Sequence, residues 1–370
     1  MTKFRIVLHD EHDNLYKDLT RDTNVSWEWN RVGGCGQAAV QITKPYDYFG
    51  TNILNSIRPK SRVKIYINDE LRYQGKVLKP SLMTKSGIEQ VMLTCYGYLI
   101  DLNAVIVNTS YEGYEISSIV ADILDTVVIP NTEISASYTT EATDYAAASL
   151  TFQHSAKDAI GLLAGLAGDI EWGVDMNRQF FFKKKDKVTR RVFVIGRDIE
   201  NYQEERNDEN VINTINVFGA GSSVIPLSTL TSQMSVNRYG ERQVNLFESS
   251  IVEPSDANRL GYVTLVNSVN SQRAIKCSVL KTDEFLEAST PLGAVAINRQ
   301  TFTAPKKYGT HIKYGRTHQY GNIRNDQISN IKYDIIGGGM YITLTVQGDI
   351  PNIGDQQKRI EYEVRDLQRR

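Results

Sequence analysis

The chain has 370 residues, of which 41% are apolar, and its 42 Lys and Arg side chains nearly balance 43 Asp and Glu, leaving a net charge of −1. This composition is typical of a globular protein, and the length predicts two to three domains with full hydrophobic cores. A dedicated nucleic-acid-binding protein is not expected, because binding phosphate backbones by counterion release needs a basic excess.

The three cysteines, Cys35, Cys95 and Cys277, are too few and too far apart to form a paired metal or redox motif, so we expect them to be core residues. The apolar run near the N-terminus is only three residues long, and no run approaches the length of a membrane span. We therefore expect no export signal and no stable membrane insertion.

Residues 1–105 are predicted to form a first small antiparallel β-barrel. Apolar and polar residues alternate, as in half-buried strands, over residues 3–8, 38–43, 62–67 and 90–95. Short turns at 68–70 and 85–87 join successive strands as hairpins. A series of short hairpins of this kind is typical of a small barrel or sandwich.

Residues 106–200 predict a mixed α+β domain, and they are the acidic part of the chain with a net charge of −5. Helical spacing runs from Ile116 to Val127, and Ser155 begins a second helix that ends near Gly168. Segments 170–174 and 179–183 then form a predicted hairpin. The insertion thus separates two β units.

Residues 201–354 are predicted to form a second β-barrel unit, interrupted by a bridging helix at 255–269. Residues 355–370 predict a short C-terminal helix with an apolar stripe of Ile360, Val364 and Leu367. This stripe is too narrow to stabilise an isolated helix of this length in water, so we interpret it as an assembly interface.

The two β units are predicted to be structural repeats. Residues 61–101 and 274–348 each give strand, turn, strand and a final hairpin, and their closing strands match in length, alternation and terminal glycine. The second unit carries an insertion over residues 301–325, which we interpret as an exposed loop. If three copies of the chain formed a ring, their two repeats each would present six similar surfaces. Such a ring would suit a partner with six-fold symmetry.

Candidate chemical motifs are incomplete. Residues 9–13, His-Asp-Glu-His-Asp, are better explained as a polar turn than as a metal site, because no second ligand cluster accompanies them. Gly219-x-Gly221 follows a strand but lacks the third glycine and the helix of a dinucleotide site. Cys35 has no neighbouring base to activate it. We therefore predict a protein that is not an enzyme, with no cofactor and no metal.

Glycines are concentrated beside two tryptophans in the first unit. The segment 25–36 carries Trp27, Trp29, Arg31, Gly33, Gly34, Cys35 and Gly36. Three glycines in four positions are unfavourable in an ordinary strand, so they predict positive φ angles or close backbone approach. A later segment, 209–219, contains Asn213 and Gly219, and it is followed by Tyr239 and Gly240.

Together with the helix, strand and turn of residues 257–295, these segments resemble the tail hub proteins of long-tailed bacteriophages and the related spike proteins of contractile secretion systems. The resemblance implies a homotrimeric hub at the virion tail tip, made in the host cytoplasm, with two small barrels per subunit around a DNA exit channel. Its implied partners are the tail tube or distal tail ring, the central spike or fibre, the tape-measure protein and, transiently, the exiting DNA. Because the sequence ends soon after the second β unit, a peptidoglycan-cutting domain is not expected.

Two other functions stay open at this stage. A host-adhesion or carbohydrate-binding tail module would also use β units rich in Tyr and Asn, and the chain has 20 tyrosines. A carboxylate-dependent cell-wall hydrolase would use two of the 43 acidic side chains, although no pair stands out. Glycan-dependent sedimentation would indicate adhesion, and clearing of cell wall in a zymogram would indicate the hydrolase.

Truncation after Gly354 is the first test of the hub hypothesis. We expect the shortened subunit to fold with an unchanged melting temperature, and to assemble poorly because the stripe of Ile360, Val364 and Leu367 has been removed. Light scattering and incorporation into tails measure the effect. Normal incorporation of the truncated protein would refute the assignment of this segment.

Overall fold

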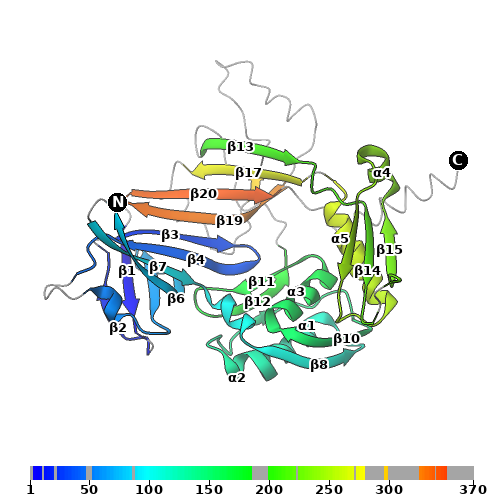
Figure 1. Cartoon of the computed structure of the whole chain (residues 1–370), viewed down its shortest axis with the longest axis horizontal. Coiled ribbons are helices and arrows are strands. Elements are labelled where there is room, and N and C mark those ends of the chain that lie inside the picture. Colours follow the sequence, from blue (N-terminus) through cyan, green and yellow to red (C-terminus); the bar gives the residue numbers. More distant parts are fainter. Residues whose placement is uncertain are drawn as a thin grey trace, which may run out of the picture.

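The computed structural model describes residues 3–10, 12–20, 23–46, 52–85, 88–185, 199–221, 224–270, 272–279, 296–298, 325–337 and 339–347. These parts are mainly β, and they form one sheet of fifteen strands, a two-stranded sheet and a three-stranded sheet. Helices lie against the smaller sheets (Figure 1). The predicted fold class, mainly β with an α+β insertion, is confirmed at this level.

The large sheet is antiparallel along its main path. Its strands follow the order β13 (Ile199–Asn207), β17 (Gln272–Val279), β20 (Gly339–Gln347), β19 (Asn325–Ile336), β3 (Thr23–Asn30), β4 (Gly33–Ile42), β7 (Ile88–Tyr96), β6 (Glu70–Lys85), β5 (Arg62–Ile67), β1 (Phe4–His9) and β2 (Leu15–Asp18). A branch leaves β4 through β11 (Ile170–Val174) to β12 (Phe180–Lys184) and β9 (Thr139–Thr140), and β18 (Ala296–Asn298) pairs with β19. N-terminal and C-terminal strands thus share one sheet through β3 and β19.

The middle segment contains the predicted helices. Helix α1 (Ile116–Ile123) continues through a π-helical turn, η3 (Leu124–Val128), into the short α2 (Ile129–Asn131). Helix α3 (Ala156–Ala167) begins where the Ser155 hydroxyl accepts a hydrogen bond from the backbone N–H of Asp158 at 3.2 Å, and it ends at Gly168 with φ of +89°. Strands β8 (Ile106–Glu112) and β10 (Ser149–Ser155) pair beside these helices, and a 3₁₀ turn, η2 (Tyr98–Asn103), precedes them.

The third sheet is β15 (Ser228–Thr231), β14 (Thr214–Phe218) and β16 (Gln243–Phe247), with β14 and β16 parallel. Helix α5 (Pro254–Ser268) packs on β14 and β15, which confirms the helix predicted at 255–269. Helix α4 (Gln233–Tyr239) joins β15 to β16, and a short 3₁₀ turn, η1 (Ile53–Ser56), precedes β5. The strand predicted over 211–219 is limited to residues 214–218.

Two hydrophobic clusters divide the molecule. The first combines buried residues between 6 and 95 with others between 275 and 344, so C-terminal strands complete the core of the N-terminal β unit. In that core Trp27 stacks on Tyr333 with ring centroids 4.8 Å apart. The second cluster extends from Tyr98 to Leu265, so the sheet around β14 packs with the middle segment. The proposed domain bounds, 1–105, 106–200, 201–354 and 355–370, stay a prediction.

The predicted repeat is wrong in its strand order. In residues 61–101, β6 is one continuous strand that pairs with β5 over one half and β7 along the other. In residues 274–348, β18 and β19 are separate antiparallel strands, and β17 pairs with β20. The chain thus reverses between β18 and β19, where β6 continues as one strand. Along its described main path the large sheet is open, ending at β13 and β2.

Two predicted features lie outside the described residues. They are the C-terminal helix with Ile360, Val364 and Leu367 and the insertion over most of residues 301–325. Among the helices that the structure describes, none is long and apolar enough to cross a membrane.

Replacing Trp27 by Ala tests the pairing of N-terminal and C-terminal strands. Trp27 is 2% exposed and lies opposite Tyr333 in the β3–β19 register. We expect the free energy of unfolding to fall by about 3–5 kcal/mol, as for other buried tryptophans. Tyr341→Ala is the matched control, because Tyr341 is 60% exposed on neighbouring β20. Equal denaturation midpoints for the two variants would contradict the assigned role.

Candidate assembly interface

The glycine segment lies where the two parts of the molecule meet. Gly33 and Gly34 have φ angles of +111° and +75°, and β4 there pairs in parallel with β11, Gly33 opposite Gly173 and Gly34 opposite Val174. A Cβ atom on Gly34 would lie 2.2 Å from the Val174 carbonyl oxygen. Both features that the sequence predicts, positive φ and close backbone approach, are therefore present.

Two further glycines complete this junction, and sequence reasoning missed them. A Cβ atom on Gly97 would lie 2.0 Å from the carbonyl oxygen of Cys35, and one on Gly173 would lie 2.4 Å from the carbonyl carbon of Gly33. An isolated glycine at the end of a strand, as at Gly97, or within one, as at Gly173, was the available signal. Gly36 is more loosely held, since its nearest neighbours are the side chains of Asn30 and Glu28.

Arg31 ties three segments together from the turn between β3 and β4. Its side-chain Nε donates to Glu171 Oε2 at 2.6 Å, and its backbone N–H donates to the carbonyl of Ser329 at 2.9 Å. Glu171, buried on β11, also contacts Lys183 Nζ at 3.1 Å. A buried carboxylate needs such partners, because removing them would leave an uncompensated charge.

A second ionic contact joins the same two parts. Arg62 on β5 donates through Nη2 to Glu133 Oε2 at 2.7 Å, and Lys76 on β6 lies 2.8 Å from Asp101 Oδ2. Burial alone would raise the pKa of Glu133, but Lys76 and Arg62 outweigh burial and hold that pKa below its ordinary value. The stability that the Glu133 ion pairs contribute is present above the pKa that Glu133 has in the unfolded chain. It is lost as the pH falls through the lower pKa that Glu133 has in the folded protein.

The remaining residues of the first motif are core residues. Trp27, Trp29 and Cys35 are all buried in the first hydrophobic cluster. Burial raises the pKa of the Cys35 thiol to about 12, so the thiol is protonated at neutral pH and is a poor nucleophile. Cys95 and Cys277 are buried as well, as predicted.

Asn213 and Gly240 come together beside the third sheet. The buried Asn213 side chain donates to the Gly240 carbonyl at 2.7 Å and accepts from the backbone N–H of Arg242 at 2.8 Å. Gly240 ends α4 with a φ of +76°. The neighbouring Tyr239 ring lies 5.1 Å from the guanidinium carbon of Arg238. These contacts fix the loop that leads into β16.

Gly219 lies at the other end of β14. A Cβ atom there would lie 2.2 Å from a Leu227 methyl group and 2.4 Å from the Ile251 carbonyl oxygen. Close packing therefore explains Gly219, and a positive φ of +71° with nothing within 4 Å of its Cβ position explains Gly221. The motif residues thus form two structural centres, one around Gly34 and one around β14.

The His9–Asp13 segment is a polar turn. Asp10 Oδ1 accepts hydrogen bonds from the backbone N–H groups of His12 and Asn14, and His9 Nδ1 lies 2.8 Å from the Asp13 carbonyl oxygen. Within the part of the chain that the structure describes, no three His, Cys, Asp or Glu residues are grouped to hold a metal ion.

Exposed apolar side chains follow one margin of the large sheet. Six neighbouring strands, β20, β19, β3, β4, β7 and β6, end there, because Ile335 lies opposite Val25, Thr23 opposite Ile42, and Ile42 opposite Val91. The exposed side chains at this margin are Leu82, Met83, Ile88, Ile336 and Tyr341. Apolar side chains gathered at one edge are typical of a surface that a partner covers.

The β6–β7 hairpin forms an arm, residues 78–85 and 88–90. Its tip, residues 83–85 and 88–90, extends beyond the end of β4, and residues 78–82 form an outer edge beside the part of β7 that pairs with β4. Every residue of β6 from 78 to 84 is exposed. A two-stranded hairpin alone is marginally stable in water, so the arm gains order from any surface that packs on it. Lys79 and Pro80 on its outer edge are residues that discourage unspecific strand pairing.

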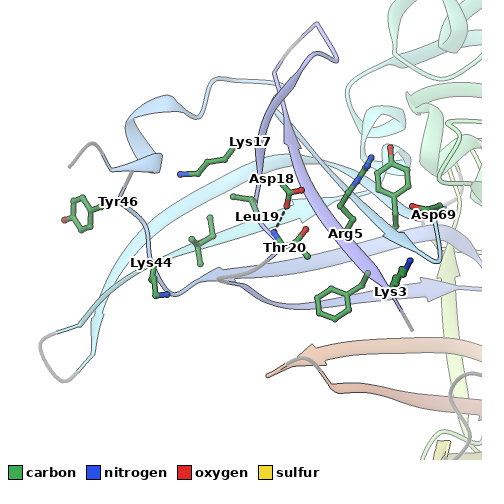
Figure 2. Close-up of a pocket in the computed structure, with 12 residues that line it drawn as sticks. Lys3, Arg5, Lys17, Asp18, Leu19, Thr20, Lys44, Tyr46 and Asp69 are labelled. Carbon is green, nitrogen blue, oxygen red and sulfur yellow. Dashed lines mark hydrogen bonds between the residues drawn. The ribbon is translucent and has the colours of Figure 1, made fainter. Parts of the chain in front are cut away.

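A basic cleft of about 930 Å³ opens beside β1 and β2. Figure 2 shows its lining, with two acidic side chains, Asp18 and Asp69, outnumbered by four basic ones, Lys3, Arg5, Lys17 and Lys44. The guanidinium of Arg5 lies 4.8 Å from the centroid of the Tyr66 ring. The cleft is therefore net positive and partly aromatic.

Comparison with solved structures places this fold among tail proteins. The 43 kDa tail protein of prophage MuSo2 from Shewanella oneidensis has a TM-score of 0.63 at 12% identity, covering 93% of this chain and 98% of that one. The tail protein from Neisseria meningitidis MC58 has a TM-score of 0.62 at 8% identity, covering 94% and 97%. In both comparisons the similarity extends over nearly the whole length of this chain and of the solved structure.

A similar fold occurs in a lidless PdpA–VgrG complex, with a TM-score of 0.51 at 9% identity over 95% of this chain and 65% of that chain. No protein-family model matches the sequence, and no curated protein matches it significantly. The likeness to tail and spike proteins that the sequence predicts is confirmed at the level of the fold.

Gly34→Ala tests the junction of β4 and β11. The added methyl group would meet the Val174 carbonyl at 2.2 Å in a backbone conformation that favours glycine, so we expect a loss of soluble yield and of melting temperature. Gly161→Ala is the matched control, because that Cβ meets only Trp172 at 3.8 Å within α3. The control should be neutral or slightly stabilising, by up to about 1 kcal/mol. Unchanged melting of Gly34→Ala would show a loose loop instead.

Proposed function

We propose that the chain is a structural subunit of a phage tail tip, the baseplate hub. In this proposal three copies form a ring that joins the tail tube or distal tail ring to a central spike or fibre and lines the DNA exit channel. The observation that carries it is the match of fold to tail proteins over 93–94% of this chain and 97–98% of theirs. Its partners would be those neighbouring tail components.

The residues of the two motifs support a structural role. Arg31, Gly34 and Asn213 hold segments together, and their polar groups are used within the fold. The exposed apolar margin and the arm give the subunit surfaces that a neighbour could cover. A protein of this kind works through assembly, so we propose that it is not an enzyme.

The different strand order removes one argument for the hub, the six similar surfaces that two repeats in each of three subunits would present, so the proposal rests on the match of the fold. A cyclic trimer needs one heterologous contact per subunit, made between two different surfaces of the same chain. Two barrel units per subunit stay part of the proposal, with β1–β7 belonging to the first and β13 and β17–β20 to the second. The pairing of β3 with β19 would then link the two units directly.

One observation favours the second candidate, a host-adhesion module. A cleft of about 490 Å³ lies between α3, β11 and the end of β16, and its lining includes His154, Trp172 and Phe247. Phe247 is exposed and stacks on Phe218 at 4.8 Å, and exposed aromatic rings suit contact with sugar faces. Sedimentation with host cell-wall glycans tests this candidate, and Phe247→Ala should abolish any binding.

The oligomeric state tests the hub directly. Light scattering should give a mass three times the 41.7 kDa of the chain. Antibody labelling of intact particles should mark the end of the tail, and a producing strain that lacks the gene should make no complete tails. A dimer, or label along the tail tube, would contradict the proposal.

The arm gives a sharper test of assembly. Changing Leu82 and Met83 together to Ser should leave the melting temperature within about 1 °C, because surface substitutions have small effects on stability. The same change should reduce incorporation into tails several-fold, since it removes apolar area that a partner covers. Met234→Ser, at an exposed apolar residue of α4, is the control. Normal incorporation of the double variant would show that the arm is not an interface.

A further inference from the structure

Three of the basic side chains of the cleft form no ion pair with a described carboxylate. No carboxylate among the described residues forms an ion pair with Lys3, Arg5 or Lys17. Concave surfaces lined by one sign of charge concentrate the electrostatic field and attract groups of opposite charge. The cleft is thus suited to an acidic surface.

The cleft also borders an open sheet edge. Strand β2 is the last strand on the described path of the large sheet, and within that path it pairs only with β1. Leu15 and Tyr16 on this strand are exposed. An edge with exposed apolar side chains beside a basic hollow offers both contact area and charge to a protein partner.

The same chain carries a complementary acidic face. Residues 106–150 contain seven carboxylates and no Lys or Arg. Five of the seven are exposed, on β8, on or just after α1, and in the loop after β9: Glu112, Asp122, Asp125, Glu141 and Asp144. Four of them have partners within the subunit. Tyr111 donates to Asp122 at 2.6 Å, and Tyr138 donates to Asp125 at 3.0 Å. The backbone N–H of Lys184 donates to Glu141 at 2.9 Å, and Lys184 Nζ lies 3.4 Å from Asp144.

The two surfaces lie in different parts of the molecule. Figure 1 shows β1 and β2 at one end, and α1 and β8 in the other lobe. They therefore cannot pair within one subunit, and a head-to-tail ring needs such a pair of different, complementary surfaces on each subunit.

We propose that, in the trimer, the basic cleft of one subunit receives the acidic face of residues 106–150 of the next subunit. This inference rests on the proposed hub function and adds the surfaces through which its subunits meet. Charge complementarity of this kind fixes the register of a contact and rejects other partners. The contact weakens at high salt, because exposed charges are screened.

A charge-swap experiment on the full chain tests the inference. Lys3→Glu with Lys17→Glu changes the net charge of the cleft from +2 to −2. Glu112→Lys with Asp125→Lys and Glu141→Lys changes the net charge of the five exposed carboxylate positions from −5 to +1. Each of these two charge-reversed variants should raise the concentration needed for half-assembly by at least about tenfold, as measured by sedimentation. The combined variant, with all five substitutions, restores opposite charges across the contact and should recover most of the assembly. Arg238→Glu, an exposed charge on α4, is the control and should assemble normally.

The outcomes separate the inference from the hub function. Loss of the trimer in both charge-reversed variants, recovery in the combined variant and unchanged melting temperatures support the inference. A trimer that persists in both charge-reversed variants overturns it while the hub stands, and the cleft then contacts another tail component. Failure of the combined variant to recover also overturns it, because the two surfaces then do not meet. A wild-type protein that forms no trimer overturns the hub function itself.

Discussion

The close approach of β4 and β11 is the contact on which the rest of the structure depends. Two backbones meet there with no room for a Cβ atom at Gly34 or Gly173. The Arg31–Glu171 ion pair lies beside this contact, and the same turn reaches β19 through a backbone hydrogen bond. One short segment thereby fixes the position of the large sheet, the middle segment and the C-terminal strands relative to one another.

This junction explains why two hydrophobic cores act as one body. The first core takes side chains from both ends of the described chain, and the second takes them from the middle. Backbone contact through glycine allows little sliding, and the Arg62–Glu133 pair adds a second, ionic link between the same parts. An assembly subunit gains from this rigidity, because ordering loose parts on binding would cost free energy.

Local features were predictable from the sequence, and long-range pairings were not. The helices at α3 and α5 followed from capping and spacing, and the glycines of segment 33–36 from their unfavourable conformational preference. The β3–β19 pairing leaves no local signal, because Trp27 and Tyr333 each read as an ordinary core residue of its own strand. The repeat failed for a similar reason, since matching strand lengths do not specify which strands are neighbours. The requirement for glycine at positions 97 and 173 comes from backbone atoms of distant segments, so the local sequence does not reveal it.

The pairing of β3 with β19 has a consequence for synthesis of the chain. Asn30 and Asn330, which bond across this pair, are 300 residues apart. At translation rates of roughly 5 to 20 residues per second, β19 is synthesised about 15 to 60 s after β3, and the edge of β3 is unpaired during that time. During that time Trp27 lacks the ring that covers it in the finished sheet. The nascent N-terminal β unit is therefore a natural substrate for chaperones, and the yield of folded protein depends on how long that edge stays protected.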